Sequence, residues 1–390
     1  MSIACRRQAI RNTKNARRNT HYEYMSSQNI FIAATRQNDG KTTVCLGLIA
    51  CLKKRYKNIG FIKPIGQRYL EEQGVKVDED SVLIEDACGI RCGLKDMSPI
   101  AVEKGSTENY ILHPDKDKIS SQIQDSYQRV SQDKDLVVIE GTGHAGVGSV
   151  FDHSNAYVAR MLGAKVVLVS SGGVGRPIDE ILLNRALFLS QGVELAGVVV
   201  NKVRGDKFDK VDNLVRRGLG DKGVEVLGVI PYQPCLSAPK IGRIVREADF
   251  RLVCGEAGLD NVVLKIVVGA MAAHKALDYL GDCCLLITPG DREDIIMTAL
   301  SCHIAGVKGC IRVSGVVITG GIMPHKTIID FIRGTDVPLI SSDYDTYKVA
   351  SIIHDLTVKI DREDKDKIKE AVDLVGQCVE IDKLLLNLTK

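Results

Sequence analysis

The chain has 390 residues, of which 45% are hydrophobic and 26% charged, as expected for a globular protein of about two domains. No apolar run reaches the ~18 residues of a membrane-spanning helix, so we expect no association with a membrane. The net charge is +3, but six basic residues and one acidic residue in 1–28 supply +5 of it. Residues 29–390 therefore carry −2, which gives no reason to expect that they bind nucleic acid.

Residues 1–28 form a basic tail, which we expect to be disordered. It has no apolar core of its own, so it is not a secretory signal. Two interpretations stay open: an organelle transit peptide, or an upstream extension ahead of a start at Met25. Because the tail has no apolar periodicity to bury, we predict that residues 1–24 are dispensable for folding.

Residues 29–235 alternate short apolar runs with helical stretches. Such runs are typical of strands buried on both faces of a parallel sheet, and the stretches between them suit crossover helices such as Ile178–Leu189. The alternation predicts an α/β fold with a doubly wound, mostly parallel sheet covered by helices. The predicted strands are Ile30–Ala34, Ile59–Ile62, Leu136–Ile139, Val166–Val169, Leu195–Val200 and Val226–Ile230.

Residues 240–358 are predicted to form a second, smaller α/β unit, after a proline-rich break. The charged run Asp361–Lys367 opens an amphipathic helix in a C-terminal extension, residues 359–390. The predicted strands of the second unit are Val262–Val268, Cys284–Ile287, Val313–Ile318 and Val337–Ile340, and its predicted helices are Met271–Tyr279, Glu293–Ile304, Lys326–Arg333 and Tyr344–Ile353.

The segment Ile30–Thr43 carries the strongest functional signal. An apolar strand runs into a polar loop that ends in Gly40, Lys41 and Thr42, and an apolar helix follows. In a phosphate-binding loop, backbone N–H groups and the helix N-terminus face the phosphates, the lysine reaches the β- and γ-phosphates, and the hydroxyl binds Mg²⁺. The alternative is a plain strand-to-helix turn, because Thr35 stands where the standard pattern has glycine. The expected nucleotide-binding residues of the loop are Thr35, Asn38, Asp39, Gly40, Lys41, Thr42 and Thr43.

Polar side chains follow several other predicted strands. Glu140 ends one of them, where an acid in a phosphate-loop protein meets Mg²⁺ directly or through water; the alternative is a cap for the next turn. Lys63 follows the second strand and would meet a phosphate or a carboxylate, or else lie on the surface, which spacing alone favours. The cluster Asp78–Asp80, taken alone, is typical of a solvated face. Asn201 follows the fifth strand, where an amide can hydrogen-bond a base edge.

The order and spacing of these motifs carry two family resemblances. Residues from about 29 to 235 resemble the dethiobiotin synthetase-like ATP-binding fold, and residues from about 240 to 358 resemble the domain named DRTGG for its Asp-Arg-Thr-Gly-Gly signature. The pair, in this order, resembles the N-terminal region of long bacterial phosphate acetyltransferases. The motifs of the first resemblance are the Gly-Lys-Thr loop, Lys63-Pro64, Asp80, Glu140-Gly-Thr-Gly and Asn201; those of the second are Val268–Met271, Thr288–Asp294, Thr319–Gly321 and His354–Lys359.

The resemblance implies that ATP and Mg²⁺ bind the first domain. Lys41 and Lys63 are then the candidate catalytic residues, with Lys63 matching a lysine that binds a substrate carbamate in dethiobiotin synthetase. Asn201 would contact adenine. The implied metal ligands are Thr42, Asp80 and Glu140.

The expected function is that of a nucleotide-binding regulatory or sensor protein, with slow ATP hydrolysis as an open question. Acetyltransferase activity is not expected, because the chain stops about where that domain of the resembling proteins would begin. One alternative is an ATP-dependent ligase of the dethiobiotin synthetase or cobyrinate amidation type, acting on a small carboxylate. Departures from the dethiobiotin synthetase pattern, such as Ala34 in the loop and Ile65–Arg68 after Lys63-Pro64, count against that activity. A third interpretation is a partner subunit of a separate acetyltransferase.

Three further expectations concern the second domain, assembly and the cell compartment. The second domain would bind a small-molecule effector or mediate assembly into a homo-oligomer, unless its Asp291–Arg292 segment merely shapes a turn. Twelve cysteines without a zinc-like spacing indicate small core residues of a protein in the reducing cytoplasm. The candidate residues of the second-domain site are Asp291, Arg292, Thr319, Gly320 and Gly321.

Overall fold

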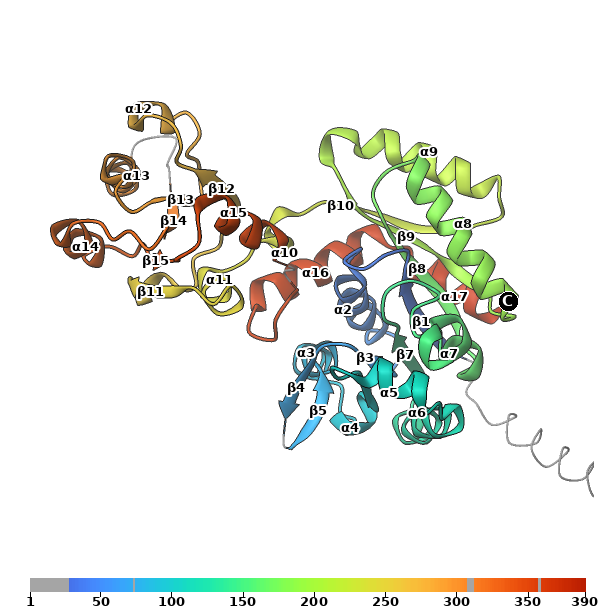
Figure 1. The fold of residues 1–390 in the computed structure, drawn as a ribbon. Helices are drawn as coiled ribbons and strands as arrows, with labels where there is room; N and C mark the ends of the chain where they lie inside the picture. Colours follow the sequence, from blue (N-terminus) through green and yellow to red (C-terminus); the bar gives the residue numbers. More distant parts are fainter. Residues whose placement is uncertain (1–27, 73, 307–311, 357–358) are drawn as a thin grey trace, which may run out of the picture. The chain divides into compact units, whose positions relative to one another are not determined.

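The computed structural model describes residues 28–72, 74–306, 312–356 and 359–390, which fall into two compact units (Figure 1). Unit 1 runs to Tyr232 and also contains Ile360–Lys390, whereas unit 2 is Gln233–Lys359. Residues 1–27 lie outside the described residues, so the dispensability of the tail stays a prediction. No helix within the described ranges is long and apolar enough to cross a membrane.

Unit 1 is built on a six-stranded sheet in the order β10-β9-β8-β1-β7-β2. Every neighbouring pair is parallel, which confirms the predicted doubly wound α/β fold. The register of β1 and β7 sets Ile32 opposite Glu140, so their carboxyl ends lie side by side. The strands are β1 (Asn29–Ala34), β2 (Ile59–Ile62), β7 (Leu136–Glu140), β8 (Lys165–Ser171), β9 (Leu195–Val203) and β10 (Val226–Pro231).

Helices cover both faces of this sheet. Because side chains alternate along a strand, Phe31 and Ala33 pack into the core cluster under α6 to α9. The C-terminal segment of the chain returns to unit 1, where α16 packs against α2 so closely that a Cβ on Gly47 would lie 2.3 Å from Val375. The helices are α2 (Lys41–Leu52), α3 (Glu79–Cys88), α6 (Lys116–Ser131), α7 (Asn155–Met161), α8 (Gly175–Ser190), α9 (Phe208–Gly220), α16 (Lys365–Cys378) and α17 (Ile381–Thr389).

Short elements between β2 and α7 build one flank of the carboxyl edge. They include an antiparallel hairpin, β4 with β5, and a two-residue parallel pair, β3 with β6. Neither pair was predicted, because exposed and charged residues interrupt the apolar pattern of β4 and β5, and β3 and β6 have only two residues each. The elements are β3 (Ile65–Gly66), β4 (Tyr69–Glu72), β5 (Val75–Asp78), α4 (Leu94–Met97), β6 (Ile100–Ala101), α5 (Ser106–Leu112) and the 3₁₀ turn η2 (Ser149–Phe151).

Unit 2 is a smaller α/β fold with a five-stranded sheet in the order β11-β15-β14-β13-β12. Four strands are parallel, and β11, which the sequence pattern did not predict, pairs antiparallel with β15 at one edge. The predicted helix Met271–Tyr279 shortens to the single turn α12. The elements are α10 (Pro234–Ser237), α11 (Ile241–Glu247), β11 (Arg251–Cys254), β12 (Lys265–Val268), α12 (Ala273–Ala276), β13 (Cys284–Pro289), α13 (Glu293–Ala305), β14 (Val313–Thr319), α14 (Lys326–Arg333), β15 (Leu339–Ser341) and α15 (Thr346–Asp355).

Candidate functional site

The loop between β1 and α2 has the backbone of a phosphate-binding loop. Gly40 is the N-cap of α2 and adopts a left-handed conformation, with φ 93° and ψ 33°. A Cβ at this position would lie 2.2 Å from the Asn201 side-chain nitrogen, so both the dihedral angles and the close approach require glycine. Lys41 and Thr42 open a helix of 12 residues, whose first N–H groups have no partner within the helix and carry a partial positive charge.

Side chains within the loop brace its turn. The buried carboxylate of Asp39 accepts hydrogen bonds from the Thr35 hydroxyl at 2.7 Å and from the Arg36 backbone N–H at 2.9 Å. Thr35 stands where the standard pattern has glycine. Its hydroxyl stabilises the turn of the loop through the hydrogen bond to Asp39. Arg36 pairs in turn with Glu180 of α8, at 3.0 Å between Nε and Oε2.

Two residues at the end of β9 hold the loop from a neighbouring strand. The Asn201 amide nitrogen donates to the backbone oxygen of Asp39 at 2.9 Å, and the Lys202 ammonium donates to that of Asn38 at 2.6 Å. Burial lowers the pKa of Lys202, an effect that the Asp39 carboxylate offsets in part. The sequence analysis did not identify Lys202, whose positive φ of 60° is the local feature that sets it apart. Asn201 supports the loop in this structure, and its contact with adenine stays a prediction.

Thr42 and Glu140 meet beside the loop. The Thr42 hydroxyl donates to Glu140 Oε1 at 3.2 Å, and the Glu140 side chain is fully buried at the end of β7. A hydroxyl and a carboxylate are the hard oxygen ligands that Mg²⁺ prefers. Among the described residues no group of three or more His, Cys, Asp and Glu could hold a metal ion.

Lys63 is buried in a cluster of carboxylates. Its ammonium forms an ion pair with Asp78 at 2.8 Å and a second one with Asp80, and all three side chains are at most 5% exposed. Burial by itself would lower the pKa of Lys63, but Asp80, Asp78 and Glu140 outweigh burial and hold that pKa well above its usual value. The surface position that spacing alone favoured for Lys63 is therefore wrong, as is the solvated face expected for Asp78 and Asp80.

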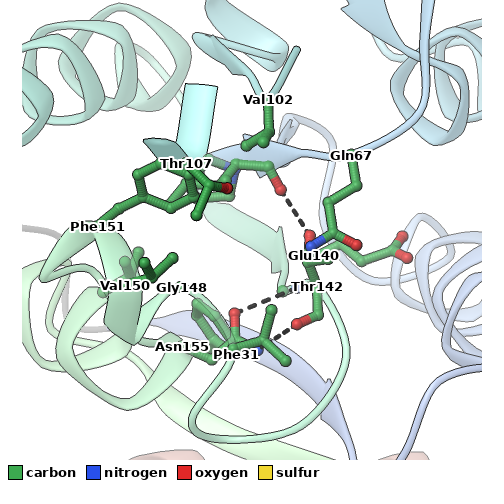
Figure 2. A pocket seen from close by; sticks show the side chains of 15 residues that line it. Phe31, Gln67, Val102, Thr107, Glu140, Thr142, Gly148, Val150, Phe151 and Asn155 are labelled. Carbon is green, nitrogen blue, oxygen red and sulfur yellow. Dashed lines mark hydrogen bonds between the residues drawn. The ribbon is translucent and has the colours of Figure 1, made fainter. Parts of the chain in front are cut away.

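A small pocket lies beside Glu140, at the ends of β1 and β7 (Figure 2). Its volume is about 180 Å³. Figure 2 shows Phe31, Val102, Val150 and Phe151 around it, with Glu140 among the polar groups that line it.

Hydrogen bonds between separate segments hold the walls of this pocket in place. The Thr142 hydroxyl donates to the backbone oxygen of Ile65 at 2.6 Å. The Asn155 amide nitrogen donates to the backbone oxygen of Thr142 at 2.8 Å (Figure 2). It also donates to the backbone oxygen of His144 at 2.7 Å. A Cβ on Gly141 would lie 2.6 Å from the Phe31 ring, so glycine is needed for this packing. The sequence analysis did not identify the pocket, because its wall residues come from distant parts of the chain.

The candidate residues of unit 2 lie in two loops that contact each other. A Cβ on Gly290 would lie 1.9 Å from the backbone oxygen of Ile322, so the loop after β13 and the loop after β14 are packed together. Arg292 donates to Asp294 at 3.0 Å and to the backbone oxygen of Met271 at 2.8 Å. Thr319 is buried and its hydroxyl bonds to that of Thr346 at 2.8 Å.

The remaining candidate residues of unit 2 shape a turn. Gly320 and Gly321 have φ values of 74° and 65°. Their N–H groups donate to the backbone oxygens of Tyr344 at 2.8 Å and Ser342 at 3.0 Å. Asp291 precedes Arg292 and helps to raise the pKa of that guanidinium, after the larger effect of the hydrogen bond that Arg292 donates to Asp294.

Two family models match the chain. The AAA_26 model, described as an AAA domain, matches residues 28–240, which is more than half of the chain. The DRTGG domain model matches residues 243–356. The order of these matches is the order expected from the motifs in the sequence.

Curated relatives include phosphate acetyltransferases from several bacteria. The protein of Nitratidesulfovibrio vulgaris is 25% identical over 368 residues, which cover 92% of this chain and 51% of that protein. The protein of Pseudomonas putida is 27% identical over 365 residues, with coverages of 90% and 50%. The chain thus spans about half the length of the curated relatives it matches.

Solved structures resemble the units at a distance. The MinC:MinD cell division protein complex of Aquifex aeolicus matches with a TM-score of 0.35 and 17% identity over 54% of this chain and 83% of that one. The CBS and DRTGG domains of the regulatory region of Clostridium perfringens pyrophosphatase, complexed with diadenosine tetraphosphate, match with a TM-score of 0.26 and 22% identity, over 32% and 49%. The family assignment comes from the two models instead, and by them the chain belongs to the AAA_26 family of P-loop AAA domains, joined here to a DRTGG domain.

Proposed function

We propose that unit 1 binds ATP with Mg²⁺ and that the chain works as a nucleotide-responsive regulatory or sensor protein. The observation that carries this proposal is the pairing of a left-handed Gly40 at the start of α2 with a hydrogen bond from Thr42 to the buried Glu140. A strand-to-helix turn without a ligand requires neither a glycine in close contact with a neighbouring strand, as Gly40 is with Asn201, nor a carboxylate such as Glu140 beside its second helical residue.

Each group of the loop has a distinct role in this proposal. The N-terminus of α2 and the Lys41 ammonium would bind the phosphates, while Asp39, Asn201 and Lys202 keep the loop in shape. Thr42 and Glu140 would hold Mg²⁺, which when bound bridges phosphate oxygens and neutralises their charge. Asp80 would act on the ion through water, because its carboxylate already pairs with Lys63.

A regulatory role fits the site better than a ligase does. The ligase alternative needs Lys63 to hold a substrate anion, but Lys63 is buried and contacts two carboxylates. Slow ATP hydrolysis is compatible with the sensor role, since a positioned water can attack the γ-phosphate with little more help than Mg²⁺ and a lysine. An acetyltransferase partner is part of the proposal, suggested by the phosphate acetyltransferases that share the two-domain region. Assembly into a homo-oligomer is proposed as well.

Calorimetric titration of the full chain with ATP and Mg²⁺ tests the proposal. Lys41→Ala removes the charge that meets the β- and γ-phosphates, so we expect the ATP affinity to fall at least about tenfold, or ~1.4 kcal/mol. Lys54→Ala, an exposed lysine just after α2, is the matched control and should bind ATP like the wild type. Equal ATP affinity in Lys41→Ala and Lys54→Ala would rule out a phosphate loop.

A further inference from the structure

A groove lies between α5 and α6 in unit 1, and none of its lining residues belongs to the phosphate-binding loop. Its volume of about 400 Å³ falls in the ~300–1,000 Å³ range of sites for small molecules. Both helices line it with residues three or four positions apart, which therefore share one face of each helix. From α5 these are Ser106, Asn109 and Tyr110. From α6 and its N-cap they are Asp115, Lys118, Ile119 and Gln122.

One side of the groove is apolar. Ile65 and Ile100 pair across the short strands β3 and β6, and both are half-buried and line the groove. The rings of Tyr110 and Phe151 meet edge to face, with their centroids 5.4 Å apart. The Tyr110 hydroxyl donates to Asp152 at 2.9 Å, so its polar end already has a partner. This side therefore suits an aliphatic group, which gains free energy by leaving water.

Two opposite charges stand on the α6 side of the groove. Asp115 and Lys118 both line it, three positions apart. Oδ1 of Asp115 accepts the Lys118 backbone N–H at 3.0 Å as the helix cap, and Oδ2 remains for a ligand. Within the described ranges, the two side chains form no ion pair with each other or with a third group. The neighbouring Lys116 has a different partner, since its ammonium lies 4.3 Å from the centroid of the Tyr157 ring.

This pair of charges favours a ligand that carries both signs. A ligand with a single charge would pair with one of the two side chains and face the like charge of the other. A zwitterion pairs with both. The remaining polar groups of the lining adapt to either end of such a ligand, because an amide or an imidazole both donates and accepts hydrogen bonds. They are the side chains of Asn109, His113 and Gln122.

We propose that this groove binds a free aliphatic α-amino acid. The ammonium of the ligand pairs with Asp115, its carboxylate pairs with Lys118, and its side chain lies against Ile65 and Phe151. The two ion pairs are open to solvent, so each raises the affinity by a factor of about three rather than by orders of magnitude. The groove lies outside the phosphate-binding loop, so the proposal does not depend on nucleotide binding.

Three probes with the same branched side chain test the proposal. Leucine, isocaproate, which lacks the ammonium, and isoamylamine, which lacks the carboxylate, are titrated into the full chain without nucleotide and followed by saturation-transfer NMR. At this size we expect dissociation constants of roughly millimolar order. Leucine should bind at least about threefold more tightly than either analogue. Equal or tighter binding of either analogue would overturn the proposal.

Two charge variants assign the ends of the ligand. Lys118→Met should abolish the advantage of leucine over isoamylamine and keep its advantage over isocaproate, because only the partner of the carboxylate is lost. Asp115→Asn should do the reverse, and asparagine still caps α6, so the helix is preserved. Lys104→Met, at an exposed position outside the groove, should keep both preferences. A wild-type preference pattern in either charge variant would overturn the proposal.

Two tryptophan variants on α6 locate the binding. Gln122 is exposed and lines the groove, so Gln122→Trp should fill part of it without disturbing the core. Gln128 is exposed on the same helix outside the groove and gives the matched control. Gln122→Trp should raise the dissociation constant of leucine at least about fivefold through lost contacts, and Gln128→Trp should leave it unchanged. Wild-type or tighter binding in Gln122→Trp would show that leucine binds elsewhere and would overturn the proposal.

Discussion

Both units place polar loops at the carboxyl ends of parallel strands, but the loops differ in how their glycines are used. In unit 1, Gly40 lets the Asn201 side chain of β9 approach the loop closely, and a 12-residue helix begins at the next residue. Gly320 and Gly321 in unit 2 form a turn whose N–H groups bond to backbone oxygens of the same unit. Arg292 likewise bonds within unit 2. The glycine of unit 1 thus permits a close approach between two segments, whereas the glycines of unit 2 form a turn held by hydrogen bonds within that unit.

Substitution of Lys63 should have the largest effect on unit 1. Lys63→Met leaves Asp78 and Asp80 buried without their cation, so we expect a loss of about 3–5 kcal/mol in the free energy of unfolding, measured with urea at pH 7. Lys54→Met, at an exposed position, should change it by less than about 0.5 kcal/mol. Similar stability in both variants would mean that the cluster is not held together by Lys63.

The pH dependence of that loss follows from the raised pKa of Lys63. A lysine whose pKa is higher in the folded state stabilises the fold fully below its unfolded value, 10.5, and loses this contribution as the pH rises through the folded pKa. The stability difference between wild type and Lys63→Met should therefore stay constant from about pH 7 to 9 and shrink above about 10.5. A difference that already falls between pH 7 and 9 would contradict the ion pairs.

The second prediction concerns Gly40, the glycine at the start of α2 in the loop of unit 1. Gly40→Ala places a Cβ 2.2 Å from the Asn201 amide and forces alanine to a φ of 93°. Such strain costs about 1–3 kcal/mol, so the ATP affinity should fall roughly ten- to a hundredfold. Gly105 is also a helix N-cap with a positive φ, 85°, but a Cβ there meets nothing within 4 Å. Gly105→Ala should keep ATP affinity, and equal losses in both variants would assign the effect to backbone strain alone.

Local patterns in the sequence predicted the sheet of unit 1 and the center of its site. Continuous apolar runs such as Leu136–Ile139 identify buried strands, and Glu140 follows from its place at a strand end. Contacts between distant segments left no such pattern. Lys63 is buried because two carboxylates, 15 and 17 positions further on, fold over it. The packing of α16 on α2 likewise brings Gly47 and Val375 into contact, and these residues are far apart in the chain.

The third prediction tests the support that β9 gives to the loop. Lys202→Met removes the hydrogen bond to the Asn38 backbone oxygen but keeps the length of the side chain. A hydrogen bond from a charged group contributes about 1.5–3 kcal/mol, part of which solvent replaces here, so ATP affinity should fall about three- to tenfold. Lys207→Met, at an exposed position after the same strand, should leave it unchanged. Unchanged affinity in Lys202→Met would show that Asn201 alone holds the loop.

The smallest effect is expected in unit 2. Arg292→Ala breaks a partly exposed ion pair with Asp294, whose side chain is 53% exposed, and one hydrogen bond to the Met271 backbone oxygen. Exposed ion pairs contribute about 0.2–1 kcal/mol, so the free energy of unfolding should fall by about 1 kcal/mol, with ATP affinity and oligomer size unchanged. Urea unfolding, ATP titration and light scattering measure the three. Near-normal stability with a changed oligomer size or ligand response would instead make the Asp291–Arg292 loop a functional site. Both units would then carry a functional site at the carboxyl ends of their parallel strands.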